Sequence, residues 1–245
     1  MPGTKLDPSS MARRVSHELF PGAVVALGMG LPCHLPGELP DNGGVWFIAD
    51  SGVLGFHGLQ GNESGQSAVD TGGNAVATLA GGSFTGVVDV AGILRGGHTD
   101  IAVLQPSQVS AGGDFVHWTT EETAGVFAPG SAVDMAYGAS TVVAVMPHQY
   151  PSGRSNIVEI CDMPVDGVGI VDIIITDSAV IRVLSAGLEL VEIAPGWTAE
   201  EVIAITEAPL TVSSDLKEMT FSTMNFEAPN KVYSTALAAL SDVPE

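Results

Sequence analysis

One carboxylate stands at the end of a buried-looking run in this sequence. Residues 47 to 58 read FIADSGVLGFHG, in which Asp50 is the first charge after the apolar segment and a loop with three glycines follows. The segment VWFIA, 45–49, predicts a short strand that ends at this carboxylate. A carboxylate at such a point can be a nucleophile or a general base where backbone amides face the reacting oxygen, and otherwise it is an ordinary solvated charge.

A second glycine loop also follows a short apolar run. AVVAL, 23–27, predicts a strand that leads directly into GMGLP. Gly28 and Gly30 would let the backbone approach a carbonyl oxygen or a phosphate and offer amide hydrogens to it. A tight turn without a ligand explains the same pattern equally well. The loop lacks the third glycine of a dinucleotide fingerprint and the lysine of a P-loop.

Two further segments place charged residues beside glycine. LRGGHTD brings Arg95, His98 and Asp100 together, which would suit an anion pocket or half of a metal site. We favour a structural turn held by an Arg95–Asp100 pair, because one histidine and one aspartate are poor metal ligands without further donors. APGSAVDMAYGAS, 128–140, predicts a turn and the start of a helix.

The remaining apolar runs outline the elements that must position these loops. Most are continuous rather than alternating, which is typical of a mainly parallel sheet flanked by helices, the α/β class. In such sheets the ligand crevice lies at the carboxyl ends of the strands, where Asp50 and the GMGLP loop stand. The further strand candidates are 86–90, 101–104, 141–146, 179–184 and 188–193.

Helix signals stand near both ends of the chain. Apolar residues at a spacing of four follow Ser9 or Ser10, either of which could be an N-cap. Thr198 and Glu201 form a capping-box pattern at the start of a later helix. Residues 209–245 are expected to form a weakly structured tail or an extension that faces a partner. His57 and His148 have no triad spacing and are expected on the surface or hydrogen-bonded in the core.

The composition describes one acidic domain. The chain has 245 residues, 45% of them hydrophobic, and 28 acidic against 8 basic residues give a formal net charge of -20. Such a surface repels nucleic acid and anionic membranes, and no apolar run approaches the length of a membrane span. Cys33 and Cys161 are too few for a disulfide scaffold and lack metal-ligand spacing. We therefore expect a cytoplasmic protein with reduced thiols, no metal and no signal peptide.

In their order, the motifs resemble the β subunit of the family I coenzyme A transferases, which include the 3-oxoacid and 3-oxoadipate enzymes. ARRVSHELFPGAVVALGMGLP, 12–32, is similar to the family run A-K-R-V-A-x-E-L-x-x-G-x-x-V-N-L-G-I-G-I-P, and ADSGVLG, 49–55, to S-E-N-G-L-L-G. LRGGHTD is similar to I-R-G-G-H-I-D and GSAVDM, 130–135, to G-G-A-M-D-L. DGVGIVDIIITDSAV and LVEIAPGWTAEEV follow the family's closing segment. The likeness spans residues 10–218 and implies the NagB/RpiA-like α/β fold of the CoA transferases.

The resemblance also implies a covalent mechanism. In the family, the glutamate of S-E-N-G attacks an acyl-CoA to form an acyl-glutamyl anhydride, and the thiolate then returns to give an enzyme-CoA thioester. The matching residue here is Asp50, which we expect to be catalytic. The neighbouring loops would shape the site and offer backbone hydrogen bonds. The residues expected to bind substrate are Gly28, Gly30, Ser51, Gly52, Gly130, Ser131 and Ala132.

Three polar members of the family's usual site are altered in this sequence. Asp50 is one methylene shorter than the family's glutamate, which withdraws the carboxylate by roughly 1.5 Å on an unchanged backbone. Ala26 stands where the family has asparagine, and Gly73 where it has lysine. Because a displacement on the order of 1 Å can cost about 100-fold in rate, these changes bear on the reaction.

Two other functions therefore stay open beside the transferase. Water that entered the gap beside Asp50 would make the chain an acyl-CoA hydrolase, acting on a thioester or on a C–C bond of a 3-oxoacyl-CoA. Glu63, in the following loop, could substitute for Asp50, although a solvated loop glutamate is the simpler interpretation. The other alternative is a non-catalytic scaffold subunit whose partner carries the active carboxylate.

The charge distribution bears on the partner. CoA carries phosphates, yet the few basic residues of this chain are not clustered, so its nucleotide end should be held elsewhere. In the family a homologous α subunit supplies most CoA contacts, which implies an αβ or α2β2 complex that acts on an acyl-CoA and a carboxylic acid. We expect a flexible leader at 1–8, the transferase domain at 9–218 and a C-terminal extension at 219–245.

Overall fold

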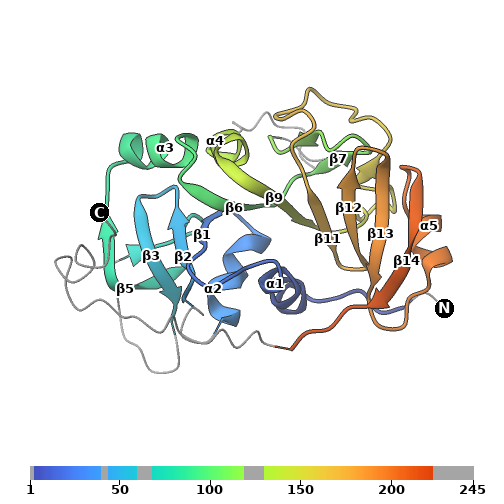
Figure 1. The fold of residues 1–245 in the computed structure, drawn as a ribbon, viewed down its shortest axis with the longest axis horizontal. Helices are drawn as coiled ribbons and strands as arrows, with labels where there is room; N and C mark the ends of the chain where they lie inside the picture. The colour runs from blue at the N-terminus through green and yellow to red at the C-terminus, as the bar shows by residue number, and fades with distance from the viewer. Residues whose placement is uncertain (1–2, 40–43, 60–67, 119–129, 223–245) are drawn as a thin grey trace, which may run out of the picture.

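The computed structural model describes residues 3–39, 44–59, 68–118 and 130–222 (Figure 1). In these residues an eleven-stranded sheet runs along the molecule in the order β14-β13-β12-β11-β9-β6-β1-β2-β3-β5-β4, and a three-stranded sheet has the order β10-β7-β8. Figure 1 shows β5 and β14 toward opposite ends of the long axis. The strands of the large sheet are β1 (Val24–Leu27), β2 (Trp46–Ala49), β3 (Val53–Gly58), β4 (Ala68–Val69), β5 (Ala75–Phe84), β6 (Thr99–Leu104), β9 (Ala139–Met146), β11 (Ile173–Thr176), β12 (Ala179–Leu184), β13 (Gly187–Ile193) and β14 (Leu210–Glu218).

The centre of the large sheet is parallel and its flanks are mixed. Strands β2, β1, β6, β9 and β11 run parallel, which confirms the predicted α/β class with a parallel core. Three residues join β2 to β3, and two join β11 to β12, so both pairs are antiparallel. Parallel neighbours need a long crossover, whereas a turn this short permits only an antiparallel return. The continuous apolar runs that predicted β1, β6 and β9 belong to the buried centre.

The small sheet and the helices complete the described fold. Its strands are β7 (Gln108–Ser110), β8 (Phe115–Val116) and β10 (Ile157–Val158). Helix α1 packs on β9 and β11, and α4 packs on β6 and β9. The helices are α1 (Pro8–Ser16), the 3₁₀ turn η1 (Leu31–His34), α2 (Leu35–Glu38), α3 (Val87–Arg95), α4 (Ala132–Gly138) and α5 (Ala199–Ile205). None of the described helices is long and apolar enough to cross a membrane.

One predicted strand is a helix. The segment 86–90 forms the N-terminal part of α3, so the strand prediction is wrong. Val90 and Leu94, four residues apart, are buried in the core while Val87 and Val88 are exposed. This spacing is that of one helix face, and burial of that face outweighs the β preference of valine.

The predicted N-cap is confirmed for α5 and is wrong for α1. Thr198 and Glu201 form the predicted capping box of α5. The N-cap of α1 is Asp7 rather than Ser9 or Ser10, since Asp7 Oδ1 accepts the Ser10 N–H at 2.7 Å and Pro8 occupies the first helical position. A proline at this position loses no hydrogen bond and already has the helical φ angle.

The segment expected as a flexible leader makes specific contacts. The Leu6 N–H donates to the Asp177 carbonyl at 2.9 Å, and Lys5 Nζ lies 3.4 Å from the Asp177 carboxylate. Trp197 Nε1 donates to the Thr4 carbonyl at 3.2 Å. Residues 4–6 are therefore bonded to the flank of the sheet that carries β11 to β14.

The expected tail contains a strand. Residues 210–218 form β14 and pair in parallel with β13, so the prediction of weak structure is wrong for this part. The Met219 N–H continues the contact by donating to the Ile193 carbonyl at 2.8 Å, and the Met219 side chain is buried. Residues 223–245 of the expected extension lie outside the described residues.

Candidate active site

Four strands of the parallel centre deliver their loops to one edge of the sheet. Leu27, the last residue of β1, pairs with Ala49 at the end of β2 and with Val103 near the end of β6. Asp50 and Gly28 therefore start neighbouring loops, as predicted from the sequence. Neighbouring strands lie about 4.8 Å apart, so the loops after β1, β2, β6 and β9 share one crevice edge.

Asp50 occupies the short turn from β2 to β3 and is half-buried. Ser131 Oγ donates a hydrogen bond to Asp50 Oδ2 at 2.5 Å. The Asp50 N–H donates to Thr71 Oγ1 at 3.3 Å, and that hydroxyl donates to the Leu27 carbonyl at 3.1 Å. Among the described residues, Asp50 Oδ1 accepts no hydrogen bond. The carboxylate is thus held through one oxygen while the other is available.

The two residues after Asp50 shape the turn that carries it. Gly52 has φ 95°, and a Cβ there would collide with the Thr85 carbonyl oxygen. The Thr85 N–H also donates to the Gly52 carbonyl at 2.9 Å. The exposed Ser51 uses its hydroxyl to donate to the Val69 carbonyl at 3.0 Å. The turn therefore requires glycine at position 52, and the hydroxyl of Ser51 is bonded within the fold.

The GMGLP loop is fastened to the loop after β6. Gly30 has φ 88°, and Gln105 Oε1 fills the space that its Cβ would occupy. The same Gln105 oxygen accepts the Leu31 N–H at 2.6 Å. The Gly28 N–H donates to the Val103 carbonyl at 2.9 Å, so this amide is engaged within the fold. Gln105, which the sequence analysis missed, thus fixes the shape of the predicted loop.

The third predicted loop meets Asp50 at the start of α4. Gly130 is exposed with φ 60°, Ser131 is the N-cap, and Ala132 is the buried first residue of the helix. From α3, Arg95 donates to Asp134 Oδ1 through Nε at 2.9 Å and Nη2 at 2.7 Å. This contact joins α3 to α4 and so helps to place Ser131.

The expected Arg95–Asp100 pair is wrong. Asp100 Oδ2 instead accepts the Val24 N–H at 2.8 Å, which ties the start of β6 to β1. Arg95 is paired with Asp134, 39 residues later in the chain. Sequence proximity suggested the first partner, but the helix directs the arginine away from the strand that follows it.

The described residues contain no group of three or more histidine, cysteine or carboxylate side chains able to hold a metal ion. His148 follows the second of the two predicted options: it is buried, with hydrogen bonds to the Thr176 and Thr206 hydroxyls at 3.0 and 2.8 Å, and burial lowers its pKa to about 4. His57 is half-buried with Nδ1 3.0 Å from the Gly58 carbonyl. Neither histidine belongs to a catalytic group in the described structure.

A hollow of about 340 Å³ lies next to Thr71 and the GMGLP loop. Burial and the nearby Asp70 raise the pKa of the Cys33 thiol to about 11, so it is a protonated thiol rather than a nucleophile at neutral pH. Gly73, which the sequence resemblance aligns with a family lysine, has φ 81°, and apart from its chain neighbours no heavy atom of the described residues lies within 4 Å of the position that a Cβ would take there. The residues that line the hollow are Met29, Gly30, Cys33, His34, Gly72 and Asn74.

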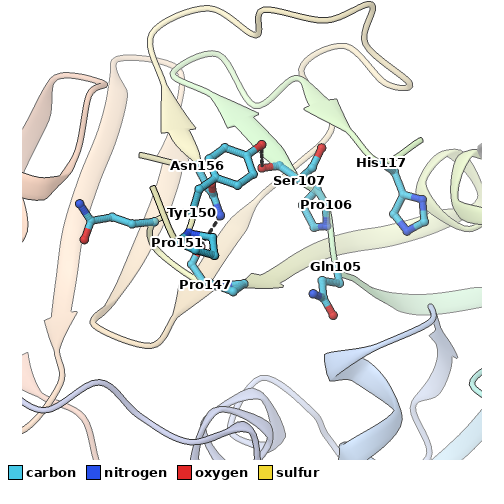
Figure 2. Close-up of a pocket in the computed structure, with 9 residues that line it drawn as sticks. Gln105, Pro106, Ser107, His117, Pro147, Tyr150, Pro151 and Asn156 are labelled. Carbon is cyan, nitrogen blue, oxygen red and sulfur yellow. Dashed lines mark hydrogen bonds between the residues drawn. The ribbon is translucent and has the colours of Figure 1, made fainter. Parts of the chain in front are cut away.

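A second cavity of about 280 Å³ lies beyond the ends of β6 and β9 (Figure 2). Tyr150 Oη donates to the Ser107 carbonyl and Asn156 Nδ2 to the Pro147 carbonyl, both at 2.9 Å. Burial lowers the pKa of His117, so its imidazole is neutral at neutral pH and the lining is uncharged. The lining consists of Gln105, Pro106, Ser107, His117, Pro147, Gln149, Tyr150, Pro151 and Asn156.

The alanine that replaces the family's asparagine brings no polar side chain to the site. Ala26 is fully buried within β1, where it supports the core and presents no polar group. Glu63 lies outside the described residues. Thr71 was missed from the sequence, because its contact with Asp50 spans 21 residues and depends on how the sheet is ordered.

Comparison with known proteins assigns the family. The family model described as Coenzyme A transferase matches residues 9–204. The chain is 36% identical over 207 residues to a 3-oxoadipate CoA-transferase subunit of Pseudomonas putida, covering 84% of this chain and 97% of that protein. It is 32% identical over 219 residues to the beta subunit of the acetate CoA-transferase of Haemophilus influenzae, covering 89% and 97%.

The fold comparison agrees. A crystal structure of an acyl-CoA transferase (YdiF) from Escherichia coli O157:H7 superposes with a TM-score of 0.72 at 17% identity, covering 94% of this chain and 48% of that one. The present chain thus spans about half the length of that protein. At this identity the likeness shows the fold, and the sequence matches show the relationship. The chain belongs to the coenzyme A transferase family.

Proposed function

We propose that this chain is the β subunit of a heteromeric CoA transferase that moves CoA between a carboxylic acid and a short-chain or 3-oxo acyl-CoA. The relatives described above are themselves subunits of CoA transferases, and the one from Haemophilus influenzae is a beta subunit. The observation that carries the proposal is the state of Asp50. In the described structure its Oδ2 is held by Ser131 while Oδ1 accepts no hydrogen bond, at the strand edge where substrates bind in α/β folds.

The proposed reaction proceeds through two covalent intermediates on Asp50. Oδ1 attacks the thioester carbon of the acyl-CoA, the C–S bond breaks, and CoA leaves as a thiolate while an acyl-aspartyl anhydride forms. The thiolate then attacks Cγ of Asp50, the Cγ–Oδ1 bond of the anhydride breaks, and the first carboxylic acid leaves as a carboxylate that carries Oδ1. An acceptor carboxylate reverses the two steps and departs as the new acyl-CoA, which regenerates Asp50.

The distribution of polar groups supports a partner and an orientation for CoA. The hollow and the cavity beside the Asp50 loops are lined by no lysine or arginine among the described residues. CoA phosphates require charge-assisted donors, so we assign them to an α subunit. The uncharged cavity of Figure 2 suits a neutral part of the substrate, such as an amide-bearing arm or an acyl chain.

The test uses the chain co-expressed with a homologous α subunit and a panel of acyl-CoA donors with acceptor acids. We expect acceptor-dependent CoA transfer, and an enzyme-bound CoA thioester that borohydride traps at Asp50. Asp50→Asn should lower turnover at least about 10³-fold. The control is Asp215→Asn on β14, a strand of the opposite flank, which should leave turnover unchanged.

Two outcomes contradict the proposal. CoA release at full rate without an acceptor acid would identify a hydrolase. Transfer activity that survives Asp50→Asn, with no adduct on this chain, would identify a scaffold subunit whose partner carries the reacting carboxylate.

A further inference from the structure

The hydroxyl of Ser131 does not perform the usual work of a helix N-cap. An N-cap serine normally accepts a hydrogen bond from an amide of its own first turn, as Thr198 does from the Glu201 N–H at 3.2 Å. Ser131 is the N-cap of α4, yet its side chain caps no amide of that helix. The hydroxyl instead donates to Asp50 Oδ2 at 2.5 Å.

Ser131 and Asp50 are both departures from the family motifs quoted above. GSAVDM places Ser131 at the second glycine of G-G-A-M-D-L, and ADSG places Asp50 at the glutamate of S-E-N-G. One side chain has lost a methylene and the side chain that touches it has gained a hydroxymethyl group. The change at 131 costs no backbone strain, because Ser131 has φ -86° while the left-handed residue is Gly130 at φ 60°.

We propose that Ser131 is a second catalytic residue, which acts by donating a hydrogen bond to the carboxylate of Asp50. Its hydroxyl fills the space that a longer carboxylate would reach into, and it donates to the oxygen of Asp50 that does not attack. This inference rests on the proposed function and assigns a role to the residue that touches Asp50. The position of the donor predicts which chemical steps depend on it.

The dependence follows from the fate of Oδ2. When Oδ1 attacks the acyl-CoA, Oδ2 becomes the carbonyl oxygen of the anhydride. Attack of the CoA thiolate on Cγ then forms a tetrahedral intermediate with its negative charge on Oδ2. The Cγ–Oδ1 bond breaks afterwards and the carboxylic acid leaves with Oδ1. The Ser131 O–H donates to this oxyanion and keeps its proton throughout, so no net proton transfer occurs. The same donor serves when the acceptor acid attacks the aspartyl-CoA thioester.

The experiment is a double-mutant cycle in the co-expressed complex, with Asp50→Glu, Ser131→Gly and the double variant. The rate measured is formation of the enzyme-CoA thioester in a single turnover, followed by intact mass. Ser131→Ala should slow this step about 100-fold, as expected for loss of one oxyanion donor. Asp50→Glu alone should be slow because the longer carboxylate meets the Ser131 side chain, and adding Ser131→Gly should recover at least about 10-fold.

The matched control is Thr198→Ala, which removes an N-cap hydroxyl that bonds its own helix. It should lower the unfolding temperature and leave thioester formation unchanged, whereas Ser131→Ala should slow thioester formation. Equal slowing by Ser131→Gly in the wild-type and Asp50→Glu backgrounds would overturn the proposal, since the two residues would then act independently.

A substrate-free measurement separates this inference from the proposed function. The same four proteins are unfolded by heat, and a non-additive shift in unfolding temperature shows that Asp50 and Ser131 are coupled in the folded state. Additive shifts would overturn the pairing whatever the enzyme does. A coupled pair in a complex that transfers no CoA would support the pairing while rejecting the transferase function.

Discussion

Thr71 stands between Asp50 and the end of β1. Its Oγ1 accepts the Asp50 N–H at 3.3 Å and donates to the Leu27 carbonyl at 3.1 Å, so one hydroxyl joins the turn that carries the carboxylate to the neighbouring strand. Side-chain to backbone bonds of this kind fix loop geometry where no regular ladder is available. The position of the Asp50 turn therefore depends on a residue 21 positions later in the chain.

Thr71→Val should lower turnover about 10- to 100-fold. Valine keeps the shape of threonine but loses both hydrogen bonds, so the Asp50 turn can shift relative to the substrate, and a shift on the order of 1 Å has about this cost. Steady-state kinetics should show the loss in kcat, because no substrate contact is removed. Thr71→Ser, which keeps the hydroxyl, is the control and should retain most of the activity. Equal activity of the valine variant and wild type would show that the Asp50 turn keeps its position without the Thr71 hydroxyl.

Gly52→Ala should lower activity about 100-fold and reduce stability. Its φ of 95° is strained for alanine, and the added Cβ would collide with the Thr85 carbonyl, so the Asp50 turn must move. Gly22→Ala is the matched control, since Gly22 has φ 85° and a Cβ there would meet no heavy atom of the described residues within 4 Å apart from its chain neighbours. That variant should lose about 1 kcal/mol of unfolding free energy and no activity. If both variants lose the same activity and stability, the effect at position 52 comes from backbone strain alone and not from the collision with the Thr85 carbonyl.

Arg14→Met should destabilise the protein by about 3 to 5 kcal/mol. Arg14 is buried and bonds Glu192 at 2.6 and 3.1 Å and Glu18 at 2.8 Å, so its loss leaves the buried Glu192 carboxylate without its main partner. Burial alone would raise the pKa of Glu192, but the bonds and charge of Arg14 hold it below its ordinary value. Arg13→Met, which removes a partly solvent-exposed pair with Glu38, is the control and should change stability less. Urea unfolding at pH 7 measures the free energy of unfolding of both variants. Equal decreases for Arg14→Met and Arg13→Met would contradict the prediction that the buried arginine contributes more.

Stability should fall by a few kcal/mol as the pH is lowered from about 6.5 to about 4. Burial lowers the pKa of His148 to about 4, so between these values the unfolded chain binds a proton at this residue that the folded chain does not. The sign is therefore a loss of stability with falling pH. Urea unfolding at several pH values, for wild type and His148→Gln, should give a shallower slope for the variant. Identical slopes would show that other groups cause the acid sensitivity.

The parallel centre of the sheet was predictable because its strands are continuous apolar runs. The predicted runs at 101–104 and 141–146 lie within β6 and β9 of this centre, and the run at 179–184 is the antiparallel β12. The antiparallel β3 and β5 were missed, because β3 begins only three positions after Asp50 and both strands contain glycine. Strand pairing supplies the hydrogen bonds that local composition does not suggest.

The site was predictable to the extent that its residues follow strand ends. Asp50 and Ser131 come into contact across 81 residues, and only the order of the motifs connected them beforehand. Thr71 and Gln105 carry no local signal, since their bonds reach Asp50 and Leu31 from distant segments. The same holds for Arg95, whose partner is set by the packing of α3 on α4 rather than by the nearest aspartate.

The bond between Arg14 and Glu192 also orders the assembly of the protein in time. The two residues are 178 positions apart, so α1 leaves the ribosome long before its partner strand exists. Contacts of this separation are formed late and slowly, and domains that depend on them expose apolar surface while they wait. Helix α1 can pack on η1 and α2 early in synthesis, whereas its contact with β13 must wait for Glu192, and a chaperone present during synthesis would have its greatest effect on that interval.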